Sequence, residues 1–129
     1  IAKTFPDNPV YLYVFDYFNP RSWGILRWTM PMMECSHCTE LAYILGKGII
    51  YPFSFDNNDR KMMDIFTSVI TNFVKNGDPN SSMGTTDLTV HWDPLTNQRN
   101  SSHYVFRLQP TMSDDYFEGR PSTVLSFES

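Results

Sequence analysis

The stretch that most restricts the fold of this chain runs from Val10 to Tyr17 and is apolar on both of its alternating faces. It is rich in β-branched and aromatic residues, and prolines precede and follow it. A strand with one face in water alternates polar and apolar residues, whereas a strand covered on both faces does not. The pattern therefore predicts a central strand covered on both sides, of the kind found in parallel sheets.

The segment after this strand combines a loop with a short helix. The loop contains Arg21-Ser22-Trp23-Gly24 and Pro31, and loops that follow such strands are where functional sites are usually built. The apolar run from Leu41 to Leu45 starts near Thr39 and stops at Gly46, which predicts a short helix with a glycine C-cap.

A longer amphipathic helix is predicted over residues 59–76. Asn57 or Asn58 is the expected N-cap, and Asp59 stands in the first turn, where a carboxylate favours the helix dipole. Lys75 and Gly77 mark its end. The apolar positions recur at helical spacing and are Met62, Met63, Phe66, Val69, Ile70, Phe73 and Val74.

The remaining third of the chain has shorter patterns. Residues 80–86 are polar and predict a loop, while 92–94 and 97–100 have turn composition. The run from Tyr104 to Leu108 alternates and predicts a late strand at a sheet edge. The sequence has no internal repeats or low-complexity tracts.

Length and charge narrow the possible functions. The 129 residues are enough for one domain, and because the first residue is Ile1 we expect the chain to be a piece of a longer protein. The formal charge of -4 has no long run of one sign behind it, so nothing suggests a nucleic-acid partner. No apolar run approaches the length of roughly 18 residues that spans a bilayer.

The chemistry-bearing residues are concentrated in the segment from Glu34 to Leu41. Cys35 and Cys38 have the C-x-x-C spacing of a redox dithiol or half a metal site. A redox dithiol needs its first thiol at a helix N-terminus after a strand, yet a long loop follows Tyr17. Zinc would need further ligands, and the candidates His91 and His103 lie in turn-like surroundings. The commonest role of such cysteines is as small buried residues.

His37, between these cysteines, is instead a candidate general base. A lone histidine is more often a hydrogen-bonded structural residue than a catalyst. His37, however, lies in a loop between a buried strand and an apolar helix, which would hold the imidazole at the edge of a sheet. Glu40, one turn further on, could support the loop by hydrogen bonding, although a solvated glutamate at a helix start is the ordinary role.

Four blocks, in order, resemble the C-terminal part of a type-B carboxylesterase of the cholinesterase-like α/β-hydrolase family. Their residues are Val10 to Tyr17, His37 with Glu40 to Gly46, Thr71 to Asn80 with its Asn-Gly-Asp-Pro-Asn end, and Trp92-Asp93-Pro94. The stretch from the first block to the last takes up about two-thirds of the chain. The similarity to nematode gut-type esterases is notable at Glu40-Leu41 and Gly46-Lys47-Gly48.

The resemblance implies roles for two residues. His37 matches the triad histidine, which deprotonates a serine and then protonates the departing alcohol. Glu40 matches a supporting acid that is not the triad acid. Two departures stand out: the family commonly has Gly where this chain has Cys38, and it prefers Trp where this chain has Ile70, an apolar exchange that should repack.

The nucleophile of the family is missing from this chain. It lies upstream in a G-x-S-x-G turn, and no G-x-S-x-G occurs in these 129 residues. We therefore expect residues 1–129 to be the C-terminal part of a single α/β-hydrolase domain, with the serine, the oxyanion loop and the triad acid elsewhere. The chain alone should be inactive, because the triad groups act as a unit.

Two other functions stay open at this point: a non-catalytic cholinesterase-like adhesion domain, and a redox module at Cys35 and Cys38. The resemblance implies a small-molecule ester substrate for the whole protein and no cofactor or metal. It also favours the secretory pathway or an extracellular location, where the sequons at Asn80 and Asn100 would be glycan acceptors. The oligomeric state cannot be inferred from the sequence.

Overall fold

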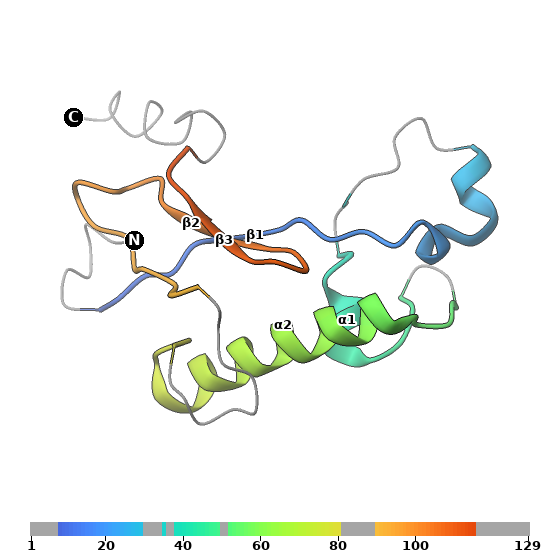
Figure 1. The fold of residues 1–129 in the computed structure, drawn as a ribbon, viewed down its shortest axis with the longest axis horizontal. Helices are drawn as coiled ribbons and strands as arrows, with labels where there is room; N and C mark the ends of the chain where they lie inside the picture. Colours follow the sequence, from blue (N-terminus) through green and yellow to red (C-terminus); the bar gives the residue numbers. More distant parts are fainter. Residues whose placement is uncertain (1–7, 30–34, 36–37, 50–51, 81–89, 116–129) are drawn as a thin grey trace. The chain divides into compact units, whose positions relative to one another are not determined.

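The computed structural model describes residues 8–29, 35, 38–49, 52–80 and 90–115 (Figure 1). The chain divides into two compact units, one of Ile1–Val14 with Thr89–Ser129 and the other of Phe15–Leu88. His37 and the polar segment 81–89 lie outside the described residues.

The first unit is built on a small sheet in the order β1-β2-β3, formed by Tyr13–Phe15, His103–Phe106 and Thr111–Ser113. β2 lies beside β3 (Figure 1) and pairs with it antiparallel. In this register His103 is opposite Ser113. This pair of strands thus departs from the parallel arrangement predicted for most of the sheet. Tyr104 also donates its backbone N–H to the carbonyl of Leu12 at 2.9 Å.

Two strand predictions need correction. The predicted edge strand is β2, which lies in the middle of this sheet with all four residues buried, because it has hydrogen-bonding neighbours on both sides. The strand predicted from Val10 to Tyr17 is shorter than expected, since β1 covers only Tyr13–Phe15. Among the described residues, β1 is also an edge strand of the sheet rather than a central one. Its outer face is incompletely covered there, and Tyr13 is 36% exposed.

The core of the first unit is aromatic. The ring of Trp92, 3% exposed, stacks on Tyr104 with 5.2 Å between centroids and meets Tyr11, Tyr13 and Phe106 edge-on. Edge-to-face and offset arrangements suit the quadrupoles of the rings. The turn predicted at residues 92–94 therefore carries the central core side chain of this unit.

Among its described residues, the second unit has three helices, which are drawn in Figure 1. They are the 3-10 helix η1 (Pro20–Trp28) and the α-helices α1 (Leu41–Leu45) and α2 (Asn57–Asn76). α1 packs against α2. η1 lies in the segment predicted as a loop, and it is interrupted at Gly24, where φ is 51°. That backbone conformation is accessible to glycine and costly for other residues.

The helix predictions at α1 and α2 are confirmed, with one correction. α1 ends at Gly46 in the left-handed conformation, and α2 ends in the same way at Gly77. α2 begins two residues earlier than predicted, and its N-cap is Asp56 rather than an asparagine, because the Asp56 side chain accepts the backbone N–H groups of Asn58 and Asp59.

The buried face of α2 follows the predicted helical period in part. Met62, Phe66 and Val69 are 0% exposed, and Ile65 belongs to the same face. Near the end of the helix, Phe73 and Val74 are 42% and 77% exposed, so the predicted apolar stripe is not covered over its full length. None of the helices in the described part of the chain is both long and apolar enough to cross a bilayer.

Candidate active-site loop

The loop that contains His37 is fixed on both sides by residues that the structure describes. Before it, the thiol of Cys35 donates to the backbone carbonyl of Tyr17 at 2.9 Å. After it, the carbonyl of Cys38 accepts the backbone N–H of Leu41, the first residue of α1, at 3.2 Å. The described residues on either side of His37 are therefore each bonded to a packed element.

Cys38 has a backbone conformation that is rare for a residue with a side chain. Its φ is 66°, the one left-handed non-glycine residue in the described part of the chain. This conformation brings Cβ close to the following carbonyl and costs roughly 1–2 kcal/mol. The glycine common in the family at this position has no such cost, so the departure noted in the sequence has a physical meaning: a thiol stands where the backbone favours glycine.

The two cysteines are both half-buried, and neither forms a disulfide. Cys35 is held by its bond to Tyr17, and the next described residues, 38–40, form a turn before α1. This differs from a redox dithiol, whose first thiol is activated at a helix N-terminus. Among the described residues, no three His, Cys, Asp or Glu side chains are grouped so that they could hold a metal ion.

Glu40 is the N-cap of α1, but its side chain makes no capping hydrogen bond. Its backbone carbonyl accepts the N–H groups of Tyr43 at 3.0 Å and Ile44 at 3.3 Å. The side chain is half-buried. Its predicted role as a supporting acid therefore stays a prediction.

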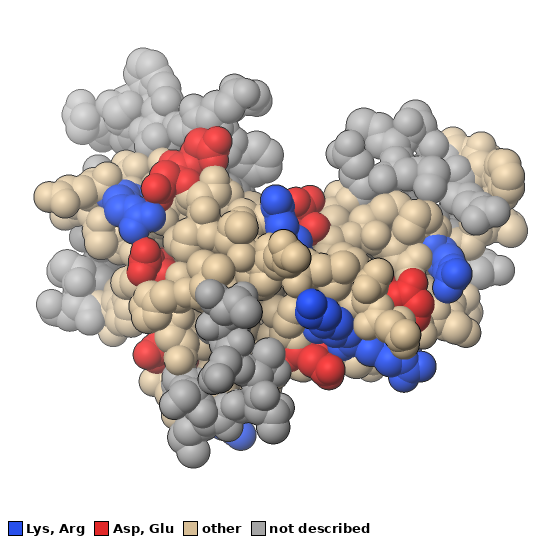
Figure 2. All heavy atoms as spheres, in the orientation of Figure 1, with Lys and Arg blue, Asp and Glu red and all other residues tan. Residues whose placement is uncertain are grey.

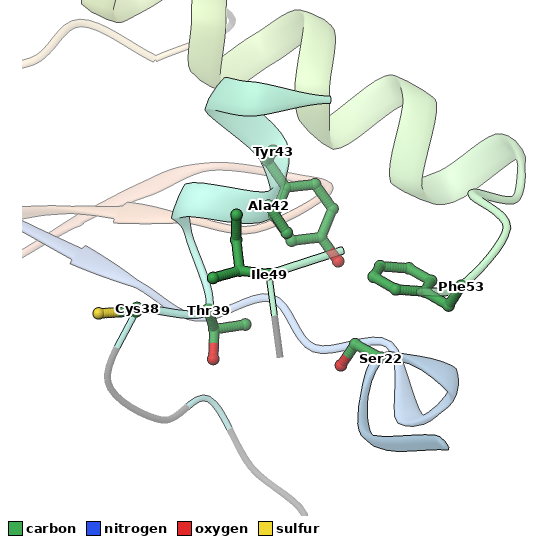
Figure 3. A pocket seen from close by; sticks show the side chains of 7 residues that line it. All are labelled: Ser22, Cys38, Thr39, Ala42, Tyr43, Ile49 and Phe53. Atoms are coloured by element: carbon green, nitrogen blue, oxygen red, sulfur yellow. The ribbon is translucent and has the colours of Figure 1, made fainter. Parts of the chain in front are cut away.

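A small pocket adjoins this segment (Figure 3). Tyr43 and Phe53 provide aromatic walls, while Ser22 and Thr39 contribute hydroxyl groups. Cys38 stands at one end, and its sulfur is directed away from the two rings (Figure 3). The thiol is consequently beside the pocket rather than inside it.

The described residues of the second unit contain a buried polar network that the sequence did not predict. It is a group of five residues, here called the Asp59 cluster: Tyr17, Asn19, Tyr43, Asp56 and Asp59. The Asp59 side chain is 0% exposed. A buried carboxylate is tolerated only when donors satisfy its oxygens, and four donors do so here.

Each oxygen of Asp59 accepts two hydrogen bonds. The hydroxyl groups of Tyr17 and Tyr43 donate to Oδ1 at 3.0 and 3.1 Å. The side-chain amide of Asn19 and the backbone N–H of Asp56 donate to Oδ2. The donors come from the segment after β1, from α1 and from the N-cap of α2. One side chain thus joins three parts of the unit.

The surroundings of the two phenols in the Asp59 cluster raise the pKa of both hydroxyl groups. Burial, followed by the hydrogen bond to Asp59 and its negative charge, raises the pKa of Tyr17 above the ordinary value. For Tyr43, burial is again the largest cause of the raised pKa, and the charge of Asp59 is the second. In both cases the environment favours the neutral form, which is the donor form.

At the surface, charges of both signs are interspersed among uncharged areas on the face drawn in Figure 2. In the first unit, the exposed Arg99 pairs with Asp93 at 2.9 Å and with Asp114 at 2.8 Å. The hydrogen bonds that Arg99 donates, first those to Asp114, raise the pKa of Arg99, and the Arg99 guanidinium lowers the pKa of Asp114. Such exposed pairs connect the turn near residue 93 with the end of β3.

The two predicted sequons differ in surroundings. Asn80 follows the end of α2, and both its backbone N–H and its side-chain amide donate to Oδ1 of Asp78, at 2.9 and 3.0 Å. Asn100 is exposed at a turn, where its side-chain oxygen accepts the Ser101 hydroxyl. Ser102, the hydroxyl residue of the second sequon, is 1% exposed.

Solved structures with this arrangement of strands and helices are α/β-hydrolase esterases. A PNB esterase superposes with a TM-score of 0.66 at 18% identity, covering 89% of this chain and 21% of that one. The carboxylesterase EST55 of Geobacillus stearothermophilus gives 0.60 at 24% identity, also over 89% and 21%. This likeness shows the fold: the chain has the architecture of part of an α/β hydrolase, as predicted.

Sequence comparison gives the family. The family model described as "Carboxylesterase family" matches residues 2–124. Esterase cest-33 of Caenorhabditis elegans is 39% identical over 114 residues, which is 88% of this chain and 20% of the relative. Human Neuroligin-2 is 26% identical over 84% of this chain and 14% of its own length. The chain belongs to the carboxylesterase family, and it spans about a fifth or less of these relatives.

Proposed function

We propose that this chain contributes the general acid/base, His37, to a serine carboxylic-ester hydrolase. Family membership over residues 2–124 supports an esterase, and so does the similarity to a nematode esterase. The structural observation that favours His37 is the double attachment of its loop, through Cys35 to Tyr17 and through Cys38 to α1. A base must be held in place to accept a proton in the transition state.

In this proposal His37 takes the proton of a serine hydroxyl as the oxygen attacks the ester carbonyl. It then gives that proton to the departing alcohol, and the cycle repeats with water to release the acid. Glu40 would support the loop without being the triad acid. The substrate would be a small-molecule carboxylic ester, and no cofactor is needed because the chemistry is acyl transfer by side chains.

The serine would come from outside these residues, since no G-x-S-x-G occurs among them. The expected result is that the 129-residue chain alone hydrolyses no ester, whereas the longer protein that contains it does. Replacing His37 by Ala in the longer protein should abolish turnover, because the triad groups act as a unit. A chain that is active alone and loses activity on His37→Ala would refute the requirement for an upstream serine.

The similarity to Neuroligin-2, whose name denotes no esterase, favours a second candidate: a non-catalytic domain of the same fold that acts by binding a partner. The two candidates differ in one measurable property. A longer protein that folds, contains His37 and still fails to hydrolyse a range of carboxylic esters would support the binding domain. The bond from the Cys35 thiol to the backbone carbonyl of Tyr17 makes a redox module the weaker third possibility.

We also propose that the protein enters the secretory pathway and carries N-linked glycans. Both sequons start at asparagines in turns near the surface of their units, where a glycan can be accommodated.

A further inference from the structure

We propose that Asp59 is a positioning residue for the general base His37, acting through the Tyr17 and Tyr43 hydroxyls that converge on it. This inference rests on the proposed role of His37. Asp59 stands 22 positions after His37 in the sequence, within α2, and no sequence motif connects the two residues. The connection comes from the bonds on either side of the His37 loop.

On the upstream side, the path from the loop to Asp59 has two hydrogen bonds. Cys35 donates its thiol proton to the carbonyl of Tyr17, and Tyr17 donates its hydroxyl to Oδ1 of Asp59. The Tyr17 ring also meets the Tyr43 ring edge-on, with 5.4 Å between centroids. The start of the loop is thereby fixed to the buried carboxylate through a single residue.

On the downstream side, the path runs through α1. The Cys38 carbonyl accepts the N–H of Leu41, and the Tyr43 hydroxyl donates to the same Oδ1 of Asp59 at 3.1 Å. Tyr43 is 1% exposed and its ring contacts Phe15 and Phe55, so α1 cannot rotate without breaking this packing. Both sides of the loop therefore depend on one oxygen atom.

Asp59 can act in this way because it is itself held rigidly. Its backbone N–H donates to Oδ1 of Asp56 at 3.0 Å, and its Oδ2 accepts the N–H of Asp56 at 2.8 Å, which completes a capping box at the start of a 20-residue helix. Asn19 donates to the same Oδ2 and accepts the N–H of Arg21 at 2.9 Å. A rigid supporting residue of this kind keeps a reacting group in its productive geometry.

The Asp59 carboxylate can fill this role because both of its oxygens accept hydrogen bonds, which a side chain of the same shape with an NH₂ group cannot do. All four groups around the side chain are donors, so an asparagine in place of Asp59 would turn its own NH₂ group toward other donors. Either the phenols or the Asn19 amide and the Asp56 N–H would then lose their acceptor. Misplacement of a catalytic group by about 1 Å can reduce a rate by about a hundredfold.

The test uses the longer protein that contains these residues, with p-nitrophenyl acetate as substrate. Asp59→Asn should lower kcat by about tenfold to a hundredfold while KM changes by less than about twofold, measured well below the melting temperature. Asp64→Asn removes an exposed carboxylate from the same helix and is the matched control. It should keep the parent kcat.

The variants Tyr17→Phe and Tyr43→Phe keep the rings and remove one donor each. They test the positioning role of Asp59 even if Asp59→Asn fails to fold. Each should lower kcat by a few-fold, and the double variant should lose less than the product of the two losses, because both hydroxyls serve one oxygen. A purely structural role would lower the melting temperature and leave kcat of the folded protein unchanged, which would overturn the inference.

His37→Gln separates this inference from the function on which it rests. An active His37→Gln variant would overturn both the proposed general base and the positioning role of Asp59. An inactive His37→Gln variant together with parent-like kcat in Asp59→Asn and in both phenylalanine variants would overturn the positioning role alone.

Discussion

Asp56 and Asp59 cap each other at the start of α2: the N–H of Asp59 donates to Oδ1 of Asp56 at 3.0 Å, and the N–H of Asp56 donates to Oδ2 of Asp59 at 2.8 Å. Two backbone donors that a helix start leaves without intrahelical partners are satisfied in this way. The backbone N–H of Asp59, which is the largest cause, and that of Asn58 donate to the Asp56 carboxylate and lower its pKa. The two carboxylates differ in their surroundings: that of Asp59 is buried, whereas that of Asp56 is partly exposed to solvent.

Replacing Asp56 by Ala should therefore destabilise the protein by about 1 kcal/mol, the usual cost of losing an N-cap. Chemical denaturation followed by circular dichroism at 222 nm measures the change. Asp64→Ala, on an exposed turn of the same helix, is the control and should lie within about 0.5 kcal/mol of the parent. Equal stabilities for parent and Asp56→Ala would show that the capping box contributes nothing.

The sequence predicted those parts of the fold that depend on neighbouring residues. The presence of α1 and α2 and their glycine ends at Gly46 and Gly77 follow from helical period and backbone conformation, which are local properties. The place of β2 in the sheet did not follow, because one alternating segment does not reveal how many strands pair with it.

The Asp59 cluster could not be predicted for a similar reason. Its side-chain partners Tyr17 and Asn19 lie 42 and 40 positions away, and Tyr43 had the pattern of an ordinary apolar helix residue. One signal was available: Asp59 stands three residues after Asp56, at the spacing of a capping box. His37 itself lies outside the described residues, so its role still rests on the family and on its attached loop.

Cys38→Gly should stabilise the protein by up to about 1 kcal/mol. The left-handed φ of 66° is costly for cysteine and free for glycine, although glycine also gains entropy in the unfolded chain. Cys38→Val should have the opposite effect, because a β-branched side chain tolerates this conformation least. The midpoint of urea unfolding, measured under reducing conditions, distinguishes the three proteins. A less stable glycine variant would mean that the thiol makes contacts that outweigh the strain.

Stability should fall in alkaline solution, in part through Tyr104. Burial raises the pKa of Tyr104 to about 12, and among the described residues its hydroxyl has no hydrogen-bond partner. Because the folded pKa lies above the unfolded value of about 10, the stabilisation is complete below pH 10 and is lost as the pH rises toward 12.

The check is absorbance at 295 nm together with thermal melting between pH 9 and 12. Exposed tyrosines should ionise near pH 10 in the folded protein, whereas Tyr104 should ionise only with unfolding. Tyr104→Phe should lose less stability over that interval than the parent. Ionisation of every tyrosine near pH 10 with the fold retained would contradict the prediction.

Expression through a secretory pathway should add glycans at Asn100 and at Asn80. Ser102, required for the Asn100 sequon, is 1% exposed in the fold, so an enzyme must reach that sequon before the first unit is complete. Asn100→Gln and Asn80→Gln should each remove one glycan, seen as a mobility shift abolished by glycosidase treatment. Thr96→Val, which leaves both sequons intact, should leave the shift unchanged. Absence of any shift in the secreted parent would disprove the modification.

The bonds that converge on Asp59 also set an order of events during synthesis. Tyr17, Cys35, His37 and Tyr43 all leave the ribosome before Asp59 does, and their shared acceptor arrives with the first turn of α2. Until then the two phenols lack the carboxylate to which they donate in the folded protein. The loop of the proposed base is therefore completed late, after a segment that takes no part in the chemistry has been translated.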